Sequence, residues 1–66
     1  MAVVKVIEVI SEGKTIDEAM KAAIDEVSKT VENITQINVE HIHGLVEDKK
    51  IKKIRINSKV SFIKKQ

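Results

Sequence analysis

The sequence has 66 residues, with 12 basic and 10 acidic side chains, two histidines and no cysteine. This length allows one domain, residues 1–66, and the lack of cysteine excludes disulfides and thiolate metal sites. The net charge of +2 and the single aromatic residue, Phe62, do not fit a nucleic-acid surface, which usually has a larger basic excess and stacking aromatics. No run approaches the roughly 20 apolar residues of a membrane span, and the start MAVVKVIEVI is too charged for a signal peptide. We therefore expect a cytoplasmic protein without nucleic-acid or membrane partners.

The first predicted strand covers residues 3–10, VVKVIEVI, because this run is β-branched and partly alternating. Residues 11–14, SEGK, predict the turn that follows it. Residues 15–33 then have a helical period, with an apolar face formed by Ile16, Met20, Ala23, Val27 and Thr30/Val31.

Both ends of the predicted helix have local signals. Thr15 followed by Glu18 fits a capping box, and Asp17 and Glu18 place negative charge at the positive end of the helix dipole. Asn33 suits the C-terminal end because asparagine tolerates the left-handed conformation.

Two further strands, residues 37–46 and 51–63, are predicted on either side of a polar turn at 47–50. Simple alternation in the first of them places Ile37, Val39, His41 and His43 on one face, and Asn38, Glu40, Ile42 and Gly44 on the other. The second alternates most clearly, with Ile54, Ile56, Ser58, Val60 and Phe62 facing one way and Arg55, Asn57, Lys59 and Ser61 the other.

The predicted fold class is therefore α+β, with the order β-α-β-β. We expect a three-stranded antiparallel sheet, with strand 51–63 in the middle, packed on one amphipathic helix. The second face of the sheet would be bare and would carry Gln36, Asn38, Glu40, Arg55, Asn57 and Lys59. A bare face, two open edges and a core this small make a poor monomer, so the sequence predicts self-association.

His41 and His43 are candidate metal ligands, since two imidazoles two residues apart on one strand can reach one ion. The more common alternative is ordinary strand or interface histidines, and we assign no metal site. Glu47 and Asp48 offer oxygens that suit a hard cation, although a plain turn is the favoured interpretation.

Arg55 and Lys59 have two possible roles on the bare face. They form ion pairs with Glu40 or Glu8 of another subunit, or they line an anion or ligand pocket. No nucleophile–base arrangement, isolated carboxylate pair or glycine-rich phosphate loop is visible in the sequence, so we predict no catalytic residues and no enzyme activity.

The segments VVKVIEVI, AAIDEVSKTVENI, VEDKKI and KVSF, at their spacing along nearly the whole chain, resemble the dodecins. The resemblance implies the β-α-β-β fold and a hollow homododecamer built from trimers. It also implies binding of a flavin, riboflavin or FMN, in pairs between subunits, for storage or sequestration and not for catalysis.

The resemblance also implies cofactor-binding positions. The family's flavin-stacking Trp falls at Gln36, or at Asn38 if the register shifts by two, and this chain has no Trp. A Gln that hydrogen-bonds the flavin ring falls at Arg55, and a basic residue followed by Gly falls at His43 and Gly44. We therefore predict a flavin-binding assembly. The alternative is a flavin-free homologue whose shell binds another ligand or metal ions, or is structural.

Overall fold

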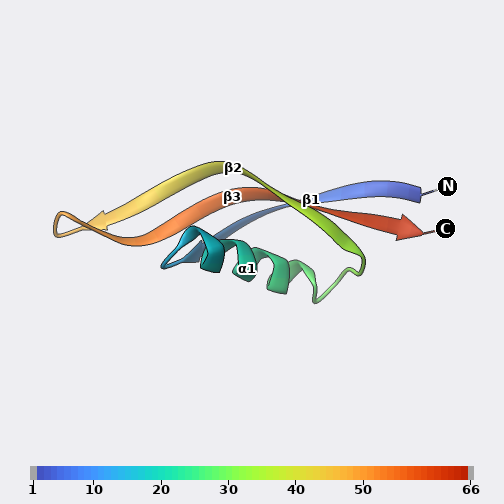
Figure 1. The fold of residues 1–66 in the computed structure, drawn as a ribbon, viewed down its shortest axis with the longest axis horizontal. Helices are drawn as coiled ribbons and strands as arrows, with labels where there is room; N and C mark the ends of the chain where they lie inside the picture. The colour runs from blue at the N-terminus through green and yellow to red at the C-terminus, as the bar shows by residue number, and fades with distance from the viewer. Residues whose placement is uncertain (1, 66) are drawn as a thin grey trace.

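One helix lies across one face of a three-stranded antiparallel sheet in the computed structural model, which describes residues 2–65 (Figure 1). The elements are β1 (Ala2–Gly13), α1 (Ile16–Val27), β2 (Ile34–Glu47) and β3 (Lys50–Lys65). The strand order is β1-β3-β2, with both neighbouring pairs antiparallel. This confirms the predicted β-α-β-β order and the central position of the last strand.

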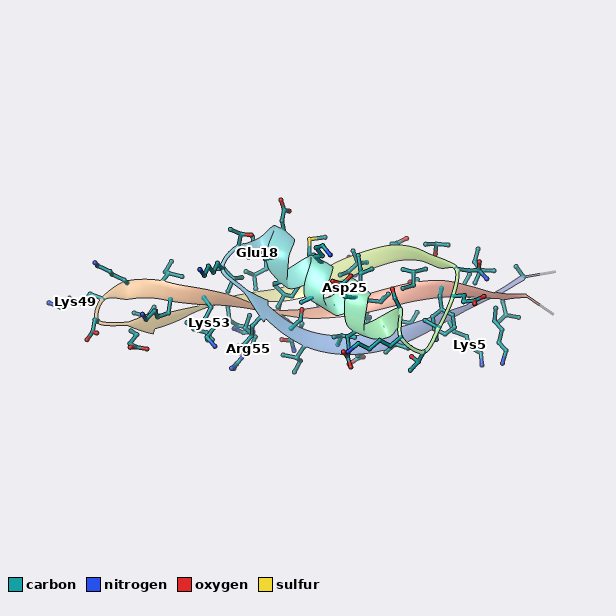
Figure 2. The ribbon with its side chains drawn as sticks, turned by 90° about the horizontal axis from the view of Figure 1, so that it is seen from below. Lys5, Glu18, Asp25, Lys49, Lys53 and Arg55 are labelled. Atoms are coloured by element: carbon teal, nitrogen blue, oxygen red, sulfur yellow. The ribbon has the colours of Figure 1, made fainter. Side chains whose placement is uncertain are left out.

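The β2–β3 hairpin extends past the start of the helix, with Lys49 at its tip, while the start of β1 and the end of β3 lie at the other end of the molecule (Figures 1 and 2). Asp48 and Lys49 have φ angles of 53° and 64°, as in the two-residue turns that suit the twist of a hairpin. The result is an elongated molecule of 51 × 19 × 13 Å.

The strands are longer than predicted and the helix is shorter. Residues 11–13, expected in a turn, belong to β1 and pair with β3. The helix ends at Val27 and not at Asn33. At this end the Ser28 hydroxyl donates to the Ile24 carbonyl at 2.6 Å and competes with the backbone for it. Asn33 does adopt the left-handed conformation, with φ 62°, but it does so at the entry to β2.

The helix begins as predicted, because the Thr15 hydroxyl accepts a hydrogen bond from the Glu18 backbone N–H at 3.1 Å. The residues that the helix buries differ from the predicted apolar face, however. Ala19, Ala23 and Val27 are buried, whereas Ile16 is 41% exposed. The small alanines allow the helix backbone to approach β1 closely, and the Ser11 hydroxyl donates to the Ala19 carbonyl at 2.6 Å.

The core lies between the helix and the central strand. Ile56 and Val60 of β3 are completely buried, and Ser58 between them is 2% exposed and donates a hydrogen bond to the Val9 carbonyl. The helix packs on β1 and β3 and barely touches β2. Ile42 of β2 is consequently 54% exposed, although its register partner is the buried Ile56.

A β-bulge in β2 changes which residues face the helix. Val39 pairs with Ser58 and His41 with Asn57, which leaves Glu40 as an extra residue. A one-residue insertion moves the following side chains to the opposite face. The prediction that His41 and His43 share a face with Ile37 and Val39 is therefore wrong.

We predict that Gly13→Ala destabilises the protein, by about 1–3 kcal/mol, the usual cost of overpacking. A Cβ at Gly13 would lie 2.6 Å from the Ala19 backbone nitrogen and 2.7 Å from the Glu18 Cβ. These are parts of the first helical turn and have no room to yield. Thermal unfolding followed by circular dichroism would measure the loss.

Gly44→Ala is the matched control. A Cβ there would meet only the Ile51 side chain, at 3.7 Å or more, and neither glycine has a positive φ. We expect a change within about 1 kcal/mol. If both variants unfold at the same temperature as the parent, the close approach of helix and β1 is not a constraint.

Candidate ligand-binding site

The sheet face that is turned away from α1, here called the open face, gathers polar side chains from all three strands. In β3 it carries the residues that alternate with the buried Ile56, Ser58 and Val60. The register adds their partners on the flanking strands. The main members of the open face are Glu8, Ile10 and Glu12 of β1, Arg55, Asn57 and Lys59 of β3, and Gln36, Asn38, His41 and His43 of β2.

Glu12 holds two cations at one end of the open face. Its carboxylate lies 2.7 Å from Arg55 Nη2 and 3.1 Å from Lys53 Nζ. The hydrogen bond from Arg55, followed by that from Lys53, lowers the pKa of the Glu12 carboxyl. Sequence reasoning missed this residue because it placed Glu12 in a turn, whereas Glu12 is the register partner of Arg55.

Glu40 organises a second ion pair. Lys59 Nζ lies 3.1 Å from the Glu40 carboxylate, and Asn38 Nδ2 donates to the same carboxylate at 3.2 Å. The hydrogen bond to Glu40, with the nearby charges of Glu40 and Glu8, raises the pKa of Lys59. Lys59 thus finds one of its expected partners, Glu40, within the same chain, whereas Arg55 pairs with Glu12 and not with the expected Glu40 or Glu8.

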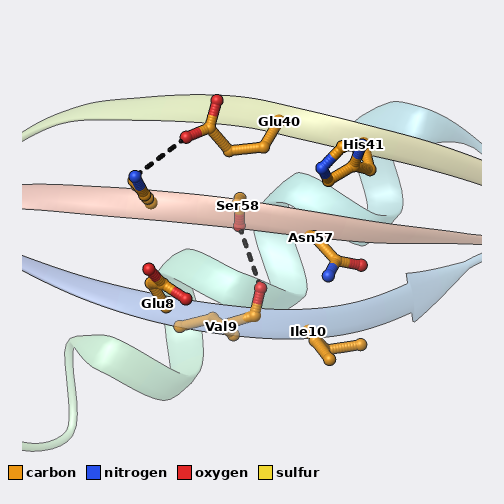
Figure 3. A pocket seen from close by; sticks show the side chains of 8 residues that line it. Glu8, Val9, Ile10, Glu40, His41, Asn57 and Ser58 are labelled. Carbon is orange, nitrogen blue, oxygen red and sulfur yellow. Dashed lines mark hydrogen bonds and ion pairs between the residues drawn. The ribbon is translucent and has the colours of Figure 1, made fainter.

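A shallow groove of about 620 Å³ runs across the middle of the open face. Figure 3 views this face with the helix behind the sheet. The groove is lined chiefly by Glu8 and Ile10 of β1, Asn57 and Lys59 of β3, and Glu40 and His41 of β2. Its volume lies within the range of small-molecule sites, and its walls combine charged, amide and aliphatic groups.

The predicted cofactor-binding residues flank this groove. Gln36 and Asn38, opposite Ser61 and Lys59, lie toward one end. His43 and Arg55 are register partners toward the other. Gly44 does not join them. Its register partner Ile54 lies on the face of the sheet that packs against the helix. The groove residues Glu8, Ile10 and Asn57 were not predicted as site residues, since only the strand register shows that they meet.

His41 and His43 both lie on the open face, with ring centroids 6.3 Å apart and ring planes inclined by 32°. Within residues 2–65, no three or more His, Cys, Asp or Glu side chains come close enough together to hold a metal ion. Among residues 2–65, no helix is long and apolar enough to cross a membrane.

These features define a class of small β-α-β-β proteins in which one sheet face packs on a helix and the other is left hollowed and polar. Residues 3–64 match the family model named Dodecin. The chain therefore belongs to the dodecin family. No curated protein sequence matches it.

The fold is shared with solved structures. The tt0972 protein from Thermus thermophilus superposes with a TM-score of 0.91 at 21% identity, over 100% of this chain and 98% of that one. The dodecin from Streptomyces coelicolor gives 0.88 at 21% identity, over 98% and 94%. The dodecin from Streptomyces davaonensis gives 0.87 at 21% identity, over 98% and 97%. At this identity the likeness establishes the fold.

We predict that Glu12→Gln lowers stability near neutral pH and flattens its dependence on pH in acid. Because the folded-state pKa of Glu12 lies below 4.5, its contribution is present above that pH and is lost as the pH falls through the lowered value. Melting temperatures of the parent and the variant should thus differ most near pH 7 and converge toward pH 3.

Glu47→Gln is the control for this series, because it removes an exposed carboxylate at the end of β2, next to the hairpin turn. Its melting temperature should follow that of the parent at every pH. A gap between parent and Glu12→Gln that stays constant from pH 7 to pH 3 would contradict the role of the Arg55 and Lys53 contacts.

Proposed function

We propose that this protein is a dodecin-like assembly that binds a flavin, riboflavin or FMN, between its subunits and stores or sequesters it in the cytoplasm. The observation that carries the proposal is the hollowed open face, in a chain of the dodecin family. Dodecins are small binding proteins rather than enzymes, and the proposed role here is likewise binding without catalysis.

Self-association is supported by what a single chain leaves uncovered. Several large apolar side chains are more than half exposed. They include Val4 and Ile10 on the open face, and Val46 and Ile51 near the tip of the hairpin. β1 and β2 are both edge strands. Exposed apolar groups and unpaired strand edges favour association. The family points to twelve copies built from trimers.

A flavin would meet different groups at the two ends of the groove. At one end, His43 and Arg55 supply hydrogen-bond donors and positive charge for a phosphate or for the polar edge of the ring. At the other end, Gln36 and Asn38 supply amides that both donate and accept. The charge of Arg55 is already shared with Glu12, so binding to an anion there competes with an existing ion pair.

The second candidate function is a flavin-free dodecin homologue, whose shell binds another small ligand or ions or is structural. The observation that favours it is the absence of Trp from this chain, since the resemblance to the family places a stacking Trp at Gln36, or at Asn38 in the alternative register. Aromatic stacking contributes about 0.5–1.5 kcal/mol beyond the buried area. A flavin pair held between two symmetry-related copies would lose this contribution twice.

Native mass spectrometry with an absorbance scan of the same purified sample tests both candidates. A twelve-subunit mass with added flavin and a yellow colour supports flavin storage. A colourless shell of bare protein mass that does not quench added riboflavin or FMN excludes it and leaves the second candidate. A monomer contradicts the assembly itself.

We predict that Gln36→Trp strengthens flavin binding by up to about a hundredfold, because two restored stacking contacts are together worth about 3 kcal/mol. Quenching of riboflavin fluorescence on titration with protein gives the dissociation constant.

Asn38→Trp is the matched variant for the alternative register. It lies on the same face of the same strand, two residues along. We expect the gain with Gln36→Trp and not with Asn38→Trp. If neither variant gains affinity, the site has diverged beyond its stacking residue, and flavin storage loses its structural basis.

A further inference from the structure

We propose that His41 and His43 form a two-ligand site for a borderline transition-metal ion, of the Zn²⁺, Ni²⁺ or Cu²⁺ class, on the open face. This inference goes beyond flavin storage and does not depend on it. It begins with the bulge at Glu40, which turns both imidazoles away from the helix and toward solvent.

The spacing of the two rings suits chelation of one ion. The ring centroids are 6.3 Å apart and the planes are inclined by 32°. With metal–nitrogen bonds of about 2.0–2.1 Å, two imidazoles on one tetrahedral ion have centroids about 5 Å apart. Both side chains are exposed, so rotations about χ1 and χ2 close the remaining distance without moving the strand.

The imidazole nitrogens are free to act as ligands. Among residues 2–65, neither His41 nor His43 takes part in the side-chain hydrogen bonds or ion pairs that hold the open face. The nearest acidic neighbour in sequence, Glu40, is committed to Lys59 and Asn38. The donors are therefore two nitrogens, which select Zn²⁺, Ni²⁺ or Cu²⁺ over the oxygen-seeking Mg²⁺ and Ca²⁺.

The surroundings tolerate a bound cation. Asn57, the register partner of His41, lies beside it on the open face and offers an amide to a metal-bound water (Figure 3). Arg55, the partner of His43, has its charge compensated by Glu12 at 2.7 Å. In the single chain the remaining coordination positions face solvent, and water or a donor from a second copy completes the shell.

Isothermal titration calorimetry of the intact assembly with Zn²⁺, Ni²⁺ or Mg²⁺ chloride at pH 7.5 tests the site. We expect saturable binding of Zn²⁺ and Ni²⁺, at one ion per chain or one per two chains, and none of Mg²⁺. His41→Gln and His43→Gln should each weaken binding at least about tenfold, because even changes to the second shell of a metal site cost 10–100-fold. Both residues are exposed, and circular dichroism and native mass verify that each variant is folded and assembled.

The matched control is the double variant Glu47→Gln with Asp48→Asn, which removes the carboxylates at the hairpin tip and leaves the imidazoles unchanged. Its affinity for Zn²⁺ should equal that of the parent. Three results would each overturn the proposal: no saturable Zn²⁺ or Ni²⁺ binding, full affinity in either histidine variant, or loss of binding in the hairpin control. None of these results bears on flavin affinity, so the two proposals fail separately.

Discussion

The close contact between the helix and the central strand is the constraint on which the rest of the structure depends. Ile56 and Val60 are buried against a helix whose inner face is built from Ala19, Ala23 and Val27. Small residues at this contact bring the backbones together, which is why Gly13 has no space for a side chain. A core confined to these few positions covers one face of β3 and leaves the other face free to meet a ligand or another chain.

The bulge at Glu40 determines what that free face can do. Without it, the alternation set by Ile37 and Val39 would turn both histidines toward the helix side. The extra residue instead places His41 and His43 in line with Gln36 and Asn38 and gives Glu40 a position from which it holds Lys59. The two proposed metal ligands, and His43 among the proposed flavin contacts, take their place on the open face from this one irregularity in pairing.

Much of the fold could be predicted from the sequence because its signals are local. The alternation from Ile54 to Phe62 and the cap at Thr15 are properties of short segments, and the structure has both of them. The helix end predicted at Asn33 is wrong, although Asn33 does adopt the left-handed conformation. The face assignment after Glu40 could not be predicted, because a bulge is defined by the partner strand. Glu12 was missed for the same reason, since its contact with Arg55 spans 43 residues of sequence. Whether Gln36, Asn38, His43, Gly44 and Arg55 bind flavin stays a prediction.

The elongated shape has a thermodynamic consequence. The radius of gyration is 13.6 Å, a value that a compact globule reaches at about 120 residues, nearly twice the length of this chain. A molecule of these proportions encloses little interior of its own, so in the proposed assembly much of the apolar burial would come from contact between subunits. In that assembly unfolding would be coupled to dissociation, and the melting temperature would rise with protein concentration by mass action. A ligand bound between subunits of the proposed assembly would add to this linkage, because its release and the dissociation of the subunits would be coupled equilibria.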